Sequence, residues 1–415
     1  MLPVSVRSRI VTVRAEEQRD RRWLTPGVAG IGGASLLSDL GHEVPTALLP
    51  SFLTATLGAP AAALGLIEGI ADGCAGVARF GGGALADDPQ RRRSAALGGY
   101  TATAVFSSLI GITTAAWQLG VFRAAAWSSR GLRVPARNAL LADVVPPAAY
   151  GRAYGFERSM DNLGAIGGPL LAIALVALVG TRDAMLVSVV PGLLAALAIL
   201  YAIRATPRAT EQERKPIRIR LRPVMRGRLG RLLVGISAFE IGNVAATLLI
   251  LRATQLLTPA HGHNTAVKIG LGLYTAYNLA ATLASVPGGH LGDRRSTQVV
   301  LLFGIACFGG AYLGLAFVGS SIALLALFFA LAGIAIGFVE TAEHAAVATL
   351  APPDIRGSAF GALAAVQAFG NFAASAVAGL LWTAISPRAA FLYLAGWMTV
   401  SAIVLARTRT EPAPH

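Results

Sequence analysis

The chain has 415 residues, of which 54% are hydrophobic and 13% are charged. Water-soluble domains carry about 25% charged residues, so this composition excludes a soluble globular protein. The formal net charge of +14 gathers in two arginine-rich segments, one before the first apolar stretch and one near the middle of the chain. That distribution indicates membrane topology and lipid contact, and we expect no nucleic-acid partner.

Apolar stretches of about 20 residues recur from Val28 to Ala406, separated by short polar or Gly- and Pro-rich segments. A helix of that length crosses the roughly 30 Å core of a bilayer. We therefore predict an all-α membrane protein with about twelve transmembrane helices. The predicted spans are residues 28–54, 60–86, 95–118, 120–144, 153–180, 184–204, 230–257, 266–291, 297–318, 321–349, 357–384 and 389–406.

The two basic segments suggest how the chain is divided. We predict a basic N-terminal segment (1–27), a six-helix bundle (28–204), a basic linker (205–229), a second six-helix bundle (230–406) and a short tail (407–415). Positively charged loops stay in the cytoplasm. The expected product is a multi-pass protein of the inner (plasma) membrane with both termini cytoplasmic.

An internal repeat relates the two predicted bundles. Residues 136–147 (ARNALLADVVPP) align with 342–353 (AEHAAVATLAPP) at an offset of 206 positions. The same offset of 206 carries residues 151–155 (GRAYG) onto 357–361 (GSAFG), and 83–87 (GALAD) onto 289–293 (GHLGD). Three elements in register indicate a duplication, which predicts two pseudo-symmetric six-helix bundles.

Charged residues are unevenly distributed over the predicted helices. The third, sixth, ninth and twelfth spans contain none apart from Arg204 at one end. An ionisable side chain that faces lipid at mid-bilayer costs about 3 kcal/mol or more. We therefore expect these four helices to face lipid, whereas the charged helices line an interior path.

This arrangement resembles the major facilitator superfamily, in which the first and fourth helices of each half line the path. Residues 83–93 (GALADDPQRRR) are similar to the signature loop of that superfamily, G-x-x-x-D-[RK]-x-G-[RK]-[RK], and 289–295 (GHLGDRR) form a partial second copy. The first copy departs from the pattern at Asp88, where a base is expected, and at Gln90, where glycine is expected. The resemblance implies a transporter with the major facilitator fold.

The signature loops predict a gate. Glycine permits close helix approach, and the acids and arginines can form ion pairs that break when the transporter changes conformation. We expect Asp143 to pair with Arg91 or Arg92; the alternative is a charge cluster that serves topology alone. The predicted gating residues are Gly83, Asp87, Arg91, Arg92, Asp143, Gly289, Asp293 and Arg294.

The fifth predicted helix contains residues 164–169 (GAIGGP), which resemble the glycine-and-proline motif of superfamily antiporters. Small residues allow close packing and proline removes a backbone donor, so Gly164, Gly168 and Pro169 are predicted to form a hinge. Ordinary packing of small residues is the alternative. The resemblance implies antiport, of the drug/proton type.

Acids within the membrane are candidates for proton coupling, since desolvation favours their protonated form. We rank Asp39, Glu43 and Asp72 first, followed by Glu68 and by Glu240 as the counterpart in the second half. The alternative is a structural lattice of ion pairs with the arginines of the fourth helix. The predicted substrate-binding residues are His42, Arg123, Arg130, Asn243, Asn278 and Glu340.

Two acid and histidine clusters allow another use. Asp39, His42 and Glu43 share one helical face, and Glu340, Glu343 and His344 share another. Each cluster offers oxygen and nitrogen ligands to a divalent cation, so a metal exporter is an alternative function.

The leading hypothesis is a secondary active transporter that works by alternating access, with proton-coupled efflux of a small molecule or ion. The Walker pattern G-x-x-x-x-G-K-[ST] is absent from the chain, which argues against direct coupling to ATP. A membrane enzyme is the alternative from another class, although we find no nucleophile and base motif. We expect a monomer surrounded by lipid, with protons as co-substrate and no cofactor.

Overall fold

A computed structural model describes residues 23–206 and 217–407, and within these ranges the regular structure is helical throughout. The predicted basic residues at 1–22 and 207–216, and the tail at 408–415, lie outside the described residues. The helices of the first half are α2 (Pro26–Ser51), α3 (Ala61–Ala86), α4 (Pro89–Ser108), α5 (Ala116–Val144), α6 (Tyr150–Val179), α7 (Thr181–Val187) and α8 (Val189–Ala205).

The second half follows the short helix α9 (Leu221–Val224). Its helices are α10 (Gly227–Gly242), α11 (Ala246–His261), α12 (His263–Arg294), α13 (Thr297–Phe317), α14 (Ile322–Leu350), α15 (Arg356–Ala384) and α16 (Pro387–Arg407). In the described part of the chain, nine helical segments are long and apolar enough to cross a membrane. The helices α2, α3 and α5 match them in length but carry many of the charged residues discussed below.

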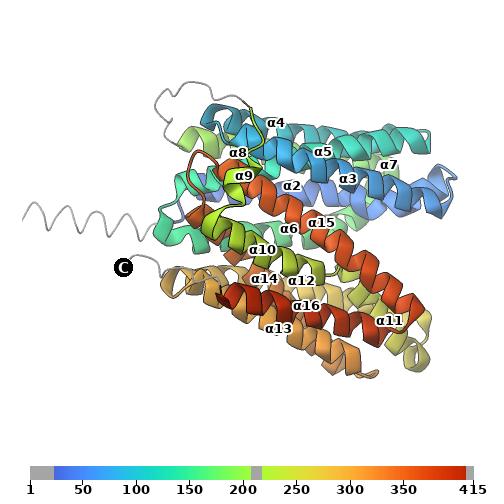
Figure 1. The fold of residues 1–415 in the computed structure, drawn as a ribbon. Helices are drawn as coiled ribbons and strands as arrows, with labels where there is room; N and C mark the ends of the chain where they lie inside the picture. The colour runs from blue at the N-terminus through green and yellow to red at the C-terminus, as the bar shows by residue number, and fades with distance from the viewer. Residues whose placement is uncertain (1–22, 207–216, 408–415) are drawn as a thin grey trace, which may run out of the picture.

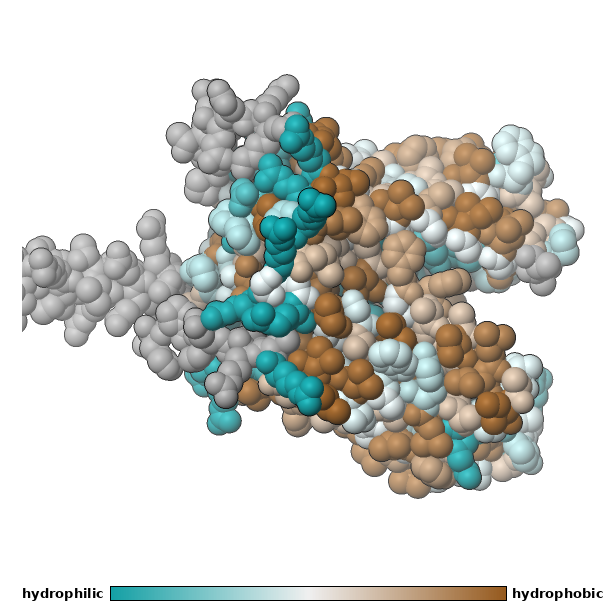
Figure 2. All heavy atoms as spheres, in the orientation of Figure 1, coloured by the Kyte–Doolittle hydropathy of each residue, from teal (hydrophilic) through white to brown (hydrophobic). Residues whose placement is uncertain are grey.

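The helices form two bundles, α2–α8 and α10–α16, that diverge like the arms of a V (Figure 1). Within the first bundle α2 packs on α6 and α8, and α3 packs on α5; within the second, α12 packs on α14 and α13 on α16. The main contacts between the bundles join α6 to α12 and α3 to α15. Figure 2 shows a hollow between the bundles at one end. We call the other end, where α3 ends and α15 begins, the closed end.

The four helices expected to face lipid pack mainly within their own bundles. α4 packs against α5 and α8, and α13 packs against α14 and α16. Large apolar side chains on these helices are exposed, among them Leu197 on α8, Phe317 on α13 and Ile403 on α16. In a bilayer such side chains contact lipid instead of water.

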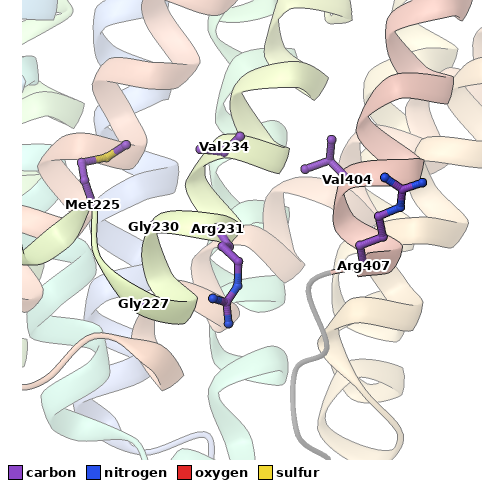
Figure 3. Close-up of a pocket in the computed structure, with 7 residues that line it drawn as sticks. All are labelled: Met225, Gly227, Gly230, Arg231, Val234, Val404 and Arg407. Carbon is purple, nitrogen blue, oxygen red and sulfur yellow. The ribbon is translucent and has the colours of Figure 1, made fainter.

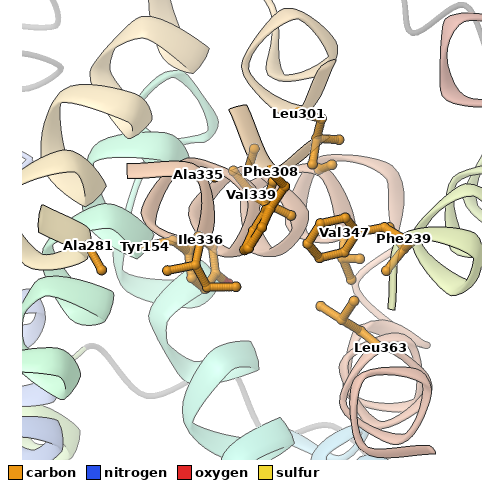
Figure 4. Close-up of a cluster of buried hydrophobic side chains, with 14 of the residues drawn as sticks. Tyr154, Phe239, Ala281, Leu301, Phe308, Ala335, Ile336, Val339, Val347 and Leu363 are labelled. Carbon is orange, nitrogen blue, oxygen red and sulfur yellow. The ribbon is translucent and has the colours of Figure 1, made fainter. Parts of the chain in front are cut away.

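The buried core is apolar and is densest in the second bundle. Phe239 of α10, Phe308 of α13 and Val339 of α14 converge there (Figure 4). Tyr154 extends this cluster toward the first bundle, since it lies on α6 and contacts the ring of Phe360 on α15.

Three predicted helix limits were wrong. The third span begins at Pro89, not at residue 95, because the Asp88 carboxylate caps α4 by accepting hydrogen bonds from the backbone N–H groups of Gln90 and Arg91. The same span ends early: α4 ends at Ser108, and the 3-10 helix η2 (Leu109–Ile112) follows it. The seventh span is not one helix, because residues 243–245 separate α10 from α11.

Candidate functional site

The closed end is held by a carboxylate of the first bundle on a helix start of the second. Asp87, which follows α3, accepts a hydrogen bond from the backbone N–H of Ser358 at 2.8 Å and another from its hydroxyl at 2.5 Å. Ser358 lies in the first turn of α15, where free N–H groups and the helix dipole favour an anion. A Cβ on Gly83 would lie 2.8 Å from the Gly357 carbonyl oxygen, so only glycine permits this approach.

A second contact repeats this geometry with the bundles exchanged. Asp293 of α12 accepts hydrogen bonds from the backbone N–H groups of Gly151 and Arg152 at 2.7 and 3.0 Å, and from Arg152 Nε at 2.8 Å. A Cβ on Gly289 would lie 2.0 Å from the Gly151 carbonyl oxygen. We call the Asp87–Ser358 and Asp293–Gly151/Arg152 contacts the twin latches, since the sequence repeat relates them.

A third ionic contact at the closed end has no counterpart in the repeat. Arg92 forms an ion pair with Asp143, and Arg356 of the second bundle approaches the same carboxylate at 3.7 Å. Of the two partners predicted for Asp143, the structure therefore selects Arg92. The predicted gating residue Arg294 lies exposed at the end of α12.

Deeper in the first bundle, buried acids and arginines form a lattice. Arg137 of α5 lies 2.6 Å from Glu157 of α6, and Arg158 lies 2.8 Å from the same carboxylate. Asp161 is 3.4 Å from Arg137 and 3.3 Å from Arg158. Arg158 also approaches Glu340 of the second bundle at 3.7 Å. Such a lattice of ion pairs is the structural alternative to proton coupling that the sequence analysis left open.

A second group of paired charges involves a predicted substrate residue. Arg123 of α5 lies 3.0 Å from Glu68 of α3 and donates a hydrogen bond to the hydroxyl of Thr46 at 2.9 Å. Its guanidinium also lies 3.3 Å from the ring centroid of Trp127. Arg123 and Glu68 therefore neutralise each other beside an aromatic face, an arrangement favourable to a buried guanidinium.

Asp39 and Glu43, the acids of α2, lie close to further arginines of α5 and to His42. Asp39 is buried, with Arg130 at 3.8 Å and Arg133 at 3.9 Å. His42 lies 3.6 Å from Asp39 through Nδ1 and 3.6 Å from Glu43 through Nε2. The Arg130 side chain is 31% exposed, which makes it more accessible than buried Arg133.

The predicted hinge lies against this acid face. A Cβ on Gly164 would lie 2.7 Å from the Asp39 Cβ, and one on Gly168 would lie 2.3 Å from the Glu43 Cβ. These glycines allow α2 to approach α6. Helix α6 continues through Pro169 without interruption in this conformation.

The second bundle holds acids in a different environment. Glu240 accepts a hydrogen bond from the side chain of Asn243 at 2.9 Å, and Glu343 accepts one from Gln367 at 3.0 Å. Asn278 donates back to its own helix, to the Tyr274 carbonyl oxygen at 3.0 Å. Asp72 of α3 is exposed, although it was ranked among the first coupling acids.

Sequence reasoning missed one polar stripe. Gln367, Asn371 and Ser375 recur every four residues on α15. Gln367 donates a hydrogen bond to α14, whereas Asn371 donates to, and Ser375 accepts from, the break after α10. The spacing i, i+4, i+8 in an apolar helix was a signal visible in the sequence.

The two predicted metal clusters do not form a three-ligand site. No group of three His, Cys, Asp or Glu residues in the described ranges is arranged to hold a metal ion. In the second cluster, Glu340 turns to Arg158 and Glu343 to Gln367, while the ring of His344 lies 5.7 Å from that of Tyr154.

A pocket of about 500 Å³ lies away from all these groups, between the start of α10 and the end of α16 (Figure 3). Met225, Val234 and Val404 supply apolar walls, and Arg231 and Arg407 lie at its edge. Its position at the closed end separates it from the buried acids, so we do not place the transport path there.

Comparison with known proteins agrees with this architecture. A sequence profile of the Major Facilitator Superfamily matches residues 31–256 and 232–415. An uncharacterized MFS-type transporter of Methanocaldococcus jannaschii is 28% identical over 387 residues, covering 92% of this chain and 95% of that protein.

Two solved transporters show the same fold. The fucose:proton symporter of E. coli has a TM-score of 0.74 at 16% identity, with 94% of this chain and 100% of that chain covered. A bacterial homologue of the iron transporter ferroportin, in its outward-facing state, has a TM-score of 0.71 at 15% identity, with 93% and 99% covered. At these identities the likeness concerns the fold alone.

Proposed function

This chain belongs to the major facilitator superfamily, and we propose that it is a proton-coupled antiporter that exports a small solute by alternating access. The twin latches carry this proposal. They join the bundles only at one end, through contacts that a rocking movement can break without disturbing either bundle. Two repeat-related contacts that form in one conformation and break in the other fit a protein that opens alternately to the two sides of the membrane.

The charge distribution supports a cytoplasmic closed end. Described arginines gather there, and Figure 2 shows hydrophilic residues over the same region. They comprise Arg91, Arg92, Arg93, Arg152, Arg204, Arg218, Arg220, Arg222, Arg226, Arg228, Arg231, Arg294, Arg295, Arg356 and Arg407. By the positive-inside rule this end faces the cytoplasm, and the conformation described here is then open to the outside.

The path for the solute runs between the bundles, lined by α2 and α5 from the first and by α10 and α14 from the second. We assign solute contact to His42, Arg123, Arg130, Asn243, Asn278 and Glu340. Among these, Arg130 has the more exposed guanidinium and only distant contact with Asp39, at 3.8 Å. A solute with an anionic group could replace Asp39 as its partner.

The direction of transport rests on the residues of α6. The glycine-and-proline segment resembles that of antiporters, and its glycines contact α2 beside Asp39 and Glu43. A movement of α6 on α2 would therefore change the surroundings of these carboxylates. Exchange of a solute for protons requires that the proton affinity of such carboxylates change when the helices move.

Reconstitution in liposomes tests the function. The purified protein is placed in sealed vesicles with an imposed pH gradient, and panels of inorganic ions, organic anions and lipophilic cations are screened for movement. Gradient-driven movement that a protonophore abolishes supports the proposal. If the rate of solute movement in wild-type vesicles does not depend on the pH gradient, the proposal of proton coupling is wrong. If Asp39→Asn and Asp72→Asn both keep gradient-driven transport, the coupling role ranked first in the sequence is wrong.

A further inference from the structure

Two buried carboxyl groups of the second bundle have no cation among the described residues within 4 Å. Glu240 is 2% exposed and Glu343 is fully buried. Each carboxyl group accepts one hydrogen bond from a neutral amide, Glu240 from Asn243 and Glu343 from Gln367. The Oε1 atom of Glu343 is buried without any hydrogen-bond partner. We call these two residues the acid pair.

One face of α15 brings the acid pair together. Gly370 packs on Glu240 so closely that a Cβ there would lie 2.4 Å from the Glu240 Cβ. Gln367, which binds Glu343, lies one helical turn earlier on the same face. The two carboxyl groups interact electrostatically, and Glu240 is the strongest charged influence on Glu343.

The break between α10 and α11 completes the site. Asn371 donates to the Asn243 carbonyl oxygen at 2.8 Å, and the Ala245 N–H donates to the Ser375 hydroxyl at 3.1 Å. The break is therefore satisfied by side chains of α15 and is a built feature of the fold. It directs the Asn243 amide back to Glu240.

The acid pair and several acids of the first bundle differ in whether an arginine lies beside them, and this difference bears on whether the acid pair is ionised or protonated. In the first bundle Glu68, Glu157 and Asp161 each lie within 4 Å of an arginine, which favours the ionised form inside the protein. A buried carboxylate without a cation is strongly disfavoured and takes up a proton instead. Burial and the lack of a cation within 4 Å therefore favour protonated carboxyl groups in the acid pair, against the opposing effect of the single amide hydrogen bond that each accepts.

We propose that Glu240 and Glu343 form a proton-binding site of this transporter, loaded in the conformation described here. The inference rests on the proposed proton-coupled function and adds a proton-binding site in the second bundle to the acids of α2, whose surroundings change when α6 moves.

Charged and titratable groups on neighbouring helices can link the proton affinity of the acid pair to the conformation of the transporter. The titratable or charged groups that act on one or both acids are Glu340 on α14, Tyr277 on α12, Tyr312 on α13 and Arg79 on α3. Arg79 belongs to the first bundle and donates a hydrogen bond to the Ala364 carbonyl oxygen of α15 at 2.7 Å. When the closed end opens, α3 separates from α15, so a cation that acts on Glu240 moves and its proton affinity changes.

Infrared titration of the full-length protein in lipid tests the assignment without any knowledge of the solute. A protonated carboxyl group has a C=O stretching band that a carboxylate lacks. At neutral pH and without sodium, we expect this band in the wild type, a reduced band in Glu240→Gln and in Glu343→Gln, and the largest reduction in the double variant. Glu68→Gln is the matched control and should keep the band, because Glu68 is paired with Arg123.

Three outcomes would overturn the proposal. The first is a wild-type spectrum without the band at neutral pH, and the second is a band whose intensity in the double variant equals that of the wild type. The third is loss of the wild-type band on addition of sodium at constant pH, which would show that the acid pair holds a metal cation. Melting temperatures of all variants verify that they are folded. Failure of the vesicle assay in wild-type protein would refute the transport proposal, whereas the infrared result judges the acid pair alone.

Discussion

The twin latches allow one prediction to be worked out in magnitude. Replacing Asp87 with Ala removes two hydrogen bonds between a carboxylate and Ser358, at 2.8 and 2.5 Å. A hydrogen bond to a charged group contributes about 1.5–3 kcal/mol, and water replaces part of this when the closed end opens. A net loss of roughly 2–3 kcal/mol shifts the equilibrium between closed and open forms by roughly 30- to 150-fold, since 1.4 kcal/mol is tenfold.

Distances between two spin labels report this shift directly. Gln90 and Pro353 are exposed at the closed end on different bundles, so labelled cysteines at these positions separate when it opens. Cys74 and Cys307 are replaced beforehand, because they are free thiols. In Asp87→Ala we expect a long-distance population to appear or grow at the expense of the short one.

A control at the same end isolates the latch. Asp354 forms an exposed ion pair with Arg220 at 3.3 Å, which is worth less than about 1 kcal/mol. Asp354→Ala should therefore leave the distance distribution unchanged. If Asp87→Ala also leaves it unchanged, and the double variant with Asp293→Ala does so too, the latches do not hold the closed end and the reasoning fails.

Three further predictions follow from packing and pairing. Gly289→Ala should force the closed end apart and increase labelling of a cysteine introduced at buried Ala359 in a background without Cys74 and Cys307. Gly272→Ala on the same helix should not, because a Cβ at Gly272 meets nothing within 4 Å. Arg137→Met should lower stability by about 3–5 kcal/mol, read as a fall in melting temperature, because Glu157 loses one of its partners; an unchanged melting temperature would contradict the buried lattice. Asn371→Ala should cost about 1 kcal/mol by freeing a carbonyl group at the helix break, and increased proteolysis or hydrogen exchange at that break is the measurement that checks it.

The repeat illustrates how far sequence reasoning reaches. An offset of 206 positions places Asp87 over Asp293 and Gly151 over Gly357, so the equivalence of these residues is available from the sequence. The structure adds that each acid binds the helix start of the opposite bundle. A duplication defines which residues correspond, but contacts across the interface depend on how the two copies pack.

The pairing of charged side chains within the membrane could not be predicted from the sequence. The sequence lists the acids within the membrane, and a ranking by position placed Asp39, Glu43 and Asp72 first. The structure places Asp39 between two arginines and leaves Asp72 exposed, whereas Glu240 and Glu343 have no cation among the described residues within 4 Å. The electrostatic environment of a side chain depends on groups distant in sequence, which composition and periodicity do not locate.

The sequence by itself therefore determined the membrane class, the all-helical fold, its two related halves and which residues of the two signature loops correspond. These features follow from local hydrophobicity, helix length and repetition, each of which is a property of the chain read in order. Tertiary structure alone decided that residues 243–245 interrupt a helix, and which buried acids have partners. Those outcomes depend on the free energy of packing and pairing between distant segments, and this is where the chemistry of transport is set.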